Sequence, residues 1–169
     1  SADSVEATGI FQFFEAARLA VEQFAGPGLL WLHGRALAGA WDAPLELRYQ
    51  FADELDPEPP SFVEPPNRWL SAAHDPDELL GMVQAYAGQV ALADMCLGAW
   101  LEAFENHPLA RETLLVVTSP RGYPLGEHRR VGPCDEALYG ELLHVPLLVR
   151  VPEQDAGRWQ RLVQPRQLP

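Results

Sequence analysis

The sequence contains no lysine at all. Its twelve basic residues are all arginines, and 24 acidic residues oppose them, which gives 169 residues a formal net charge of -12. The absence of lysine excludes a lysine Schiff base, a lysine phosphate ligand and a lysine general acid. The negative charge argues against nucleic acid and anionic membrane as partners, because both would be repelled.

Cysteines and long apolar runs are also scarce. The two cysteines, Cys96 and Cys134, form no Cys-x-x-Cys or Cys/His pattern. We expect Cys96 to be a core residue of a helix and Cys134 to be a loop residue. No apolar run approaches the ~20 residues that cross a bilayer, and no membrane segment is predicted. Residues 1–6 lack the basic and apolar parts of a secretion signal, which leaves the cellular compartment open.

The length fits one domain over residues 1–169, in which roughly 70% of the surface of the unfolded chain is buried on folding. No internal repeat divides the chain. Residues 56–66 contain five prolines among acidic residues, and this composition predicts an extended surface connection rather than a domain boundary.

Three stretches have the apolar spacing of helices. Residues 8–24 form an amphipathic pattern that ends at a Gly-Pro-Gly breaker, and residues 45–55 form a weaker one. Residues 76–106 give the clearest pattern, with Asp75 as the expected N-cap and Pro76 in the first turn. Within this helix we expect three glycines to let another element approach closely: Gly81, Gly88 and Gly98.

Three apolar runs predict strands: residues 29–33, 113–119 and 146–151. The second run has no polar alternation and therefore predicts a strand buried on both faces, as in a parallel sheet. Residues 135–144 predict a short helix or turn. The order of elements predicts an α/β domain with a mostly parallel sheet flanked by helices. About three strands would leave open edges, so we expect either a homodimer or contact with further chain segments.

The loop that follows residues 113–119 is the expected site, because loops at the carboxyl ends of parallel strands carry the chemistry of α/β proteins. Its arginines offer paired donors to a small anion such as sulfate, phosphate or a carboxylate. The candidate anion-binding residues are Ser119, Arg121, His128 and Arg129, joined by Arg130 in the same loop and by His33 at the end of the first predicted strand. The alternative is a solvated loop in which the arginines pair with Glu127, Asp135 and Glu136.

No catalytic residue and no metal ligand is predicted. Ser119 and His128 lack the Gly-x-Ser-x-Gly setting of a serine nucleophile. The acidic residues 53–56 adjoin the proline-rich stretch, and those of residues 75–78 are explained as a helix cap, so neither group predicts a calcium site.

The order and spacing of these pieces resemble the sulfatases of the alkaline-phosphatase superfamily from Phe24 onward. The resemblance depends on the Trp-Asp-Ala-Pro of residues 41–44, the strand of residues 113–119 with Gly122, the Leu-Gly-Glu-His of residues 125–128, and residues 139–149. It implies an alkaline-phosphatase-like α/β fold. It also implies hydrolysis of sulfate esters by a formylglycine nucleophile, with a bound Ca²⁺ or Mg²⁺ and with histidine and lysine around the sulfate.

The chain departs from that family at the residues that carry the chemistry. The family's Thr-Ser-Asp-His-Gly reads Thr-Ser-Pro-Arg-Gly at residues 118–122, and its Pro-His-x-Pro histidine falls at Ala38. The family lysine expected between Gly132 and Tyr139 is absent, as is any Cys-x-Pro-x-Arg nucleophile motif. These departures predict a catalytically degenerate or inactive domain without metal or formylglycine. The alternatives are an anion-binding or protein-interaction module, or a fragment of a larger active sulfatase or phosphohydrolase that lacks the nucleophile-bearing amino-terminal part.

Overall fold

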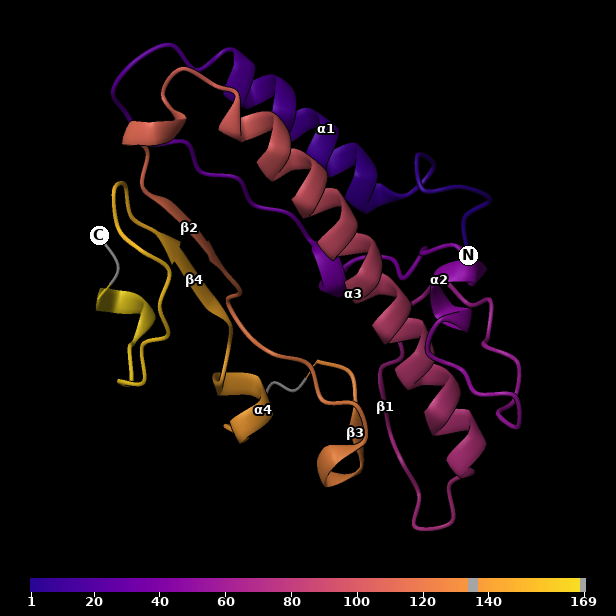
Figure 1. Ribbon diagram of the computed structural model, residues 1–169. Helices are drawn as coiled ribbons and strands as arrows, with labels where there is room; N and C mark the ends of the chain where they lie inside the picture. The colour runs from indigo at the N-terminus through magenta and orange to yellow at the C-terminus, as the bar shows by residue number, and fades with distance from the viewer. Residues whose placement is uncertain (134–136, 168–169) are drawn as a thin grey trace.

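Two long helices lie side by side, and two small strand pairs lie beside them (Figure 1). The computed structural model describes residues 1–133 and 137–167. Its helices are α1 (Gly9–Glu22), α2 (Leu45–Tyr49), α3 (Pro76–Glu105) and α4 (Gly140–Leu143). Its strands are β1 (Arg68–Trp69), β2 (Leu115–Thr118), β3 (Arg130–Val131) and β4 (Leu147–Arg150). Four 3-10 turns complete it: η1 (Ala36–Ala38), η2 (Ala110–Glu112), η3 (Glu127–Arg129) and η4 (Pro165–Gln167).

The helix boundaries follow from local capping chemistry. The Thr8 side chain accepts a hydrogen bond from the amide of Phe11 and begins α1. Asp75 accepts from the amide of Asp77, with Pro76 in the first turn, and begins α3 as predicted. Both long helices are therefore confirmed. The described residues contain no helix long and apolar enough to cross a membrane.

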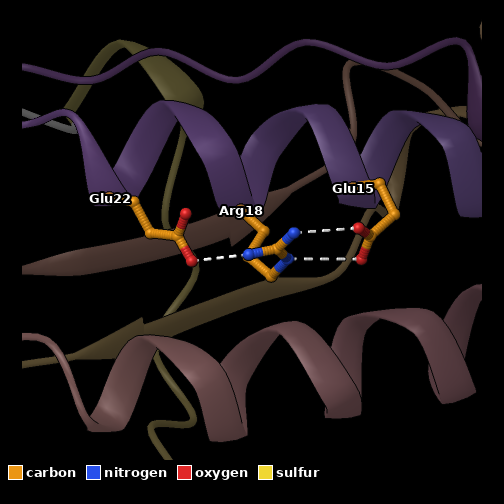
Figure 2. A network of polar contacts seen from close by, with 3 residues as sticks. All are labelled: Glu15, Arg18 and Glu22. Atoms are coloured by element: carbon orange, nitrogen blue, oxygen red, sulfur yellow. Dashed lines mark hydrogen bonds and ion pairs between the residues drawn. The ribbon is translucent and has the colours of Figure 1, made fainter.

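One side of α1 carries a partly exposed charged triad (Figure 2). Arg18 lies between Glu15 and Glu22, with its terminal nitrogens 3.1 Å and 2.5 Å from their carboxylates. Pairs three and four residues apart on a helix contribute only a few tenths of a kcal/mol each. The stability of α1 therefore comes mainly from its buried apolar side chains, Ile10, Ala17 and Val21, which belong to core clusters shared with α3.

The core lies between α3 and the elements that cover it. One cluster joins α1, α2 and the middle of α3, and a second joins the carboxyl-terminal halves of α1 and α3 with η2. The buried side chains of these clusters are Ile10, Ala17, Val21, Ala43, Leu47, Leu92, Cys96, Trp100, Phe104 and Ala110. Cys96 is a buried core residue as predicted, and burial raises the pKa of its thiol. Cys134 lies outside the described residues.

Two of the three α3 glycines accept a close neighbour. A Cβ atom at Gly88 would lie 2.8 Å from Cγ of Arg48, and one at Gly81 would lie 3.2 Å from Cδ of Pro60. A Cβ atom at Gly98 would meet nothing within 4 Å, so the expectation of a close approach is wrong at that position. Helix α2 and the proline-rich segment thus pack directly on the backbone of α3.

Arg48 anchors the proline-rich segment. Its guanidinium is fully buried and donates hydrogen bonds to the carbonyl oxygens of Trp41 (2.6 Å), Phe62 (3.0 Å) and Pro60. Burial lowers the pKa of this arginine. The predicted extended connection over residues 56–66 is confirmed, and these hydrogen bonds hold it in place.

The strands do not form the predicted parallel sheet. Strand β2 pairs antiparallel with β4, with Leu115 opposite Arg150 and Thr118 opposite Leu147. Strand β1 pairs antiparallel with β3. Each pair is a separate two-stranded sheet within the described residues. A parallel arrangement requires neighbouring strands that run in the same direction, and the pairs formed here run in opposite directions.

The first predicted strand, residues 29–33, is not a strand in the structure. Its side chains are largely exposed, with Leu29 84% and Trp31 74% accessible. Apolar residues with high β propensity form a strand only where a neighbouring strand pairs with their backbone, and the described residues offer this segment none.

The structure also corrects the burial of one predicted strand and the length of two predicted helices. Strand β2 is half-buried rather than buried on both faces, because β4 alone pairs with it and Thr118 is exposed. The helix predicted over residues 45–55 ends at Tyr49, shortly before the proline-rich segment begins. The short helix predicted over residues 135–144 occupies Gly140–Leu143, while Asp135 and Glu136 lie outside the described residues.

Candidate anion-binding site

The chain turns sharply after β2 and presses against α4. The hydroxyl of Ser119 donates to the carbonyl oxygen of Arg121 at 2.7 Å. The amide of Gly122 donates to the carbonyl oxygen of Leu142 at 2.9 Å. A Cβ atom at Gly122 would lie 1.8 Å from the carbonyl oxygen of Glu141, so only glycine fits there. The predicted strand-end loop therefore exists, and α4 fixes its first half.

The second half of the loop is a tight hairpin turn. Leu125 bridges to Val131, and the Gly126 amide donates to the Arg130 carbonyl oxygen at 2.9 Å. The backbone then has positive φ at Gly126 (115°), His128 (52°) and Arg129 (57°). Two successive non-glycine residues in the left-handed region are unusual. Such a strained backbone conformation persists only where packing and hydrogen bonds of the surrounding residues hold it.

A small apolar cluster beneath the turn supplies those surroundings. It contains Leu70 of the segment after β1, Met82 of α3 and Val131 of β3, with Leu125 packed against them. A Cβ atom at Gly126 would lie 2.9 Å from Cδ2 of Leu79, so the turn rests directly on the first part of α3.

Tyr123 adds a polar anchor to this cluster. Its hydroxyl donates to the carbonyl oxygen of Pro66, and its ring lies 5.3 Å from that of Trp41. Burial raises the pKa of Tyr123 to about 12, although the positive charge of Arg130 acts in the opposite direction. Tyr123 is therefore a structural hydrogen-bond donor in its neutral form.

His128 faces a carboxylate. Its Nε2 lies 3.3 Å from Oε1 of Glu141, and its ring stacks on Tyr139 with ring centroids 3.8 Å apart. The same Glu141 oxygen is buried and has no partner with hydrogen-bond geometry, so the contact is an ion pair when His128 is protonated. A carboxylate this close weakens the case for His128 as an anion ligand.

Arg130 is a structural residue rather than a ligand. Its side chain is buried and donates to the Val131 carbonyl oxygen at 2.6 Å and to oxygens of Asn67 and Pro133. The guanidinium also lies over the ring of Trp69, 5.5 Å from its centroid. Arg130 thus holds the hairpin turn against the segment that precedes α3.

Arg129 and Arg121 lie at the surface of the loop. The Arg129 carbonyl oxygen accepts a hydrogen bond of 2.7 Å from the amide of Leu70, which fixes its backbone. Within the described parts of the chain, the guanidinium of Arg129 forms no ion pair. Glu127, which could have paired with it, instead accepts a 2.6 Å hydrogen bond from the amide of Leu125. The alternative pairing of these arginines with Asp135 and Glu136 falls outside the described residues.

His33 lies apart from this loop. It is exposed between α1 and α2, and within residues 1–133 and 137–167 no hydrogen bond or ion pair joins it to the loop. The structure therefore joins Ser119 to Arg121 after β2, pairs His128 with Glu141 of α4, and places the Arg129 backbone beside Leu70 after β1. Over the same described residues, no three histidine, cysteine, aspartate or glutamate side chains gather closely enough to hold a metal ion.

The pairing of Trp69 with Arg130, and with it the structural role of Arg130, escaped the sequence interpretation. Trp69 and Arg130 occupy opposite positions of the β1–β3 pair, and both strands are only two residues long. Strands this short carry no detectable alternation of apolar and polar residues. The only signal was the apolar Val131 following two arginines, which is too brief to predict a pair.

Comparison with known proteins places the chain in a family. Residues 21–167 match the family model described as Sulfatase. A curated protein of Formosa agariphila named Sulfatase is 30% identical over 114 residues, which are 63% of this chain and 22% of that protein. The chain thus spans about a fifth of the length of that relative. No solved structure matches. Because the family model matches most of its length, the chain belongs to the sulfatase family.

Proposed function

We propose that this chain is a non-catalytic sulfatase-family domain that binds an anion at the loop of residues 119–129. The observation that carries the proposal is the chemistry at the end of β2. Ser119 donates its hydroxyl proton to a backbone carbonyl, and Pro120 and Arg121 follow where the resemblance implies a metal-binding carboxylate and its neighbour. A proline side chain offers no lone pair to a cation, and a guanidinium repels one.

Sulfate-ester hydrolysis needs more than a binding loop. The reaction requires a strong nucleophile and positive charge that stabilises the leaving group in the transition state. The chain has no lysine, and Ala38 stands where the resemblance implies a histidine. These residues support binding of an anion without turnover.

Arg129 is the best placed ligand. It is exposed, and its backbone is fixed by the hydrogen bond to Leu70 and by the strained turn. A guanidinium on a fixed backbone binds an oxyanion through paired donors and loses little backbone entropy on binding. Arg121 at the other end of the loop adds positive charge.

Calorimetric titration with sodium sulfate at low ionic strength tests this proposal. Arg129→Gln should weaken binding about tenfold or more, because a charge-assisted hydrogen bond contributes about 1.5–3 kcal/mol. Arg111→Gln is the matched control, since Arg111 is an exposed arginine in η2. Equal affinities for the wild type and Arg129→Gln would refute Arg129 as a ligand.

A second candidate function is favoured by the coverage of the Formosa agariphila protein, of which this chain spans 22%. In that case the chain is part of a longer, active hydrolase whose other segments supply the nucleophile and the metal ligands. The test is the natural open reading frame. If a longer frame yields a protein that cleaves an aryl sulfate in a metal-dependent reaction, this candidate is supported over the first.

A further inference from the structure

A groove lies between the proline-rich segment of residues 56–66 and the first turns of α3. Its volume is about 410 Å³, and small-molecule sites typically have volumes of about 300–1,000 Å³. Apolar surface is supplied by Pro57, Pro60, Phe62 and Pro66 of that segment and by Met82 of α3. Among the described residues, none from the loop of residues 119–129 lines the groove. It is therefore separate from the candidate anion-binding site.

The proline-rich wall of the groove is held in place by hydrogen bonds. Arg48 donates to the carbonyl oxygens of Pro60 and Phe62, and the hydroxyl of Tyr123 donates to the carbonyl oxygen of Pro66. Proline side chains also have almost no rotamer freedom to lose when a ligand covers them. A ligand in this groove therefore covers apolar surface at little cost in conformational entropy.

The charged residues that line the groove are four acids and one arginine. Nη2 of Arg68 lies 2.6 Å from Oε1 of Glu78, so these two charges offset each other. Asp77 lies in the first turn of α3, where the positive end of the helix dipole opposes its charge. Glu58 and Glu64 are exposed, and neither forms an ion pair within residues 1–133 and 137–167. The groove therefore carries an excess of negative charge.

Apolar walls and negative charge together are complementary to a cation that has an apolar body. The body leaves water for the proline and methionine surfaces, and the carboxylates attract the cation. A metal ion fits less well, because over the described parts of the chain no three acidic, histidine or cysteine side chains gather closely enough to coordinate one. A small anion would be repelled.

We propose that this groove binds a small organic ammonium ion. The apolar body of the ligand lies against the proline-rich segment and Met82, and its ammonium group lies beside Glu58 and Glu64. This inference goes beyond the proposed anion-binding function, and the guanidinium of Arg129 takes no part in it.

Titration with n-hexylammonium chloride at low ionic strength, followed by the amide chemical shifts of the ¹⁵N-labelled chain, tests the inference. The shift changes should be concentrated at the amides of Phe62, Gly81 and Met82, which line the groove. Two probes separate charge from apolar area: 1-hexanol has the same body without the charge, and ethylammonium has the same charge on a shorter body. Each should bind about fivefold or more weakly than n-hexylammonium, because it lacks either the attraction of the two exposed carboxylates or the burial of several methylene groups.

Glu58→Gln combined with Glu64→Gln should weaken n-hexylammonium binding about fivefold and leave 1-hexanol binding unchanged. Glu102→Gln combined with Glu105→Gln is the matched control, since it removes two exposed carboxylates at the other end of α3. The control should bind as the wild type does. If both double variants weaken n-hexylammonium binding equally, the cation responds only to the net charge of the chain, and the proposal is refuted.

Three other results bear on the inference. Equal affinity for n-hexylammonium and 1-hexanol would refute the role of the carboxylates. Absence of shift changes at the three groove amides would refute the location of the site. Arg129→Gln should bind n-hexylammonium as the wild type does, so that this inference and the proposed anion binding can fail separately.

Discussion

At the scale of single residues, two buried arginines hold loops by donating to backbone carbonyl oxygens. Arg48 fixes the proline-rich segment, and Arg130 fixes the hairpin turn of the candidate site. Arginine remains charged when it is buried, and its five donors can serve several carbonyls at once, whereas a lysine ammonium would tend to lose its proton. This use of arginine is compatible with a chain that contains no lysine.

The neutral state of Tyr123 predicts how stability depends on pH. Its pKa is about 12 in the folded chain and about 10 in an unfolded one, so the unfolded state loses its proton first as pH rises. The contribution of Tyr123 to the free energy of unfolding should therefore be constant below about pH 9 and fall by about 1 kcal/mol per pH unit between pH 10 and pH 12. Burial also raises the pKa of Tyr86, which acts in the same direction.

Urea unfolding followed by circular dichroism at pH 9, 10 and 11 measures this effect. Tyr123→Phe should be less stable than the wild type at pH 9, because the Pro66 carbonyl oxygen loses its donor, and should lose less stability as pH rises. Tyr49→Phe is the control, since Tyr49 is 48% exposed, and it should keep the wild-type decline. A wild-type stability that does not change from pH 9 to pH 11 would contradict the account.

At the level of elements, substitutions at two glycines of α3 distinguish the effect of helix propensity from the effect of close packing. Gly98→Ala should raise the free energy of unfolding by about 0.5–1 kcal/mol, because alanine favours the helix and its Cβ atom meets nothing within 4 Å. Gly88→Ala should lower the free energy of unfolding by about 1–3 kcal/mol, because its Cβ atom would lie 2.8 Å from Arg48.

Thermal and urea unfolding of the two variants check this prediction. Each variant is the control for the other, because both carry a glycine-to-alanine substitution in the same helix. If both variants change stability in the same direction, then either α2 does not pack on α3 at Gly88 or the Gly98 position is not open.

Helices were more predictable than strands because their determinants are local. Asp75 and Pro76 define the start of α3 within four residues of chain, and the apolar spacing defines its buried face. Strand pairing depends on segments far apart in sequence, so the run of residues 113–119 predicted a strand correctly but not its partner or direction. The run of residues 29–33 has strand-forming residues and no partner among the described residues.

At the scale of the whole molecule, the sequence located the candidate loop but not its internal arrangement. Ser119, Arg121, His128 and Arg129 lie in one loop as predicted. The contact of His128 with Glu141, and the burial of Arg130, depend on how α4 and β1 pack against that loop. Contacts between segments that are distant in the sequence cannot be predicted from the local spacing of residues.

Apolar side chains remain exposed on the segment of residues 29–32 and on β4, where Leu148 is 60% and Val149 46% accessible. Exposed apolar surface beside an unpaired strand edge is typical of a surface that another segment or chain covers. The homodimer, or contact with further chain segments, expected from the sequence stays a prediction that sedimentation equilibrium would check.

We propose above that the loop at the end of β2 belongs to a sulfatase-family domain that does not hydrolyse sulfate esters. The most direct test is release of 4-nitrophenol from 4-nitrophenyl sulfate by the purified chain with Ca²⁺ or Mg²⁺, before and after chelation. The account predicts release at the rate of the protein-free blank in both conditions. Release above the blank that the chelator abolishes would contradict it.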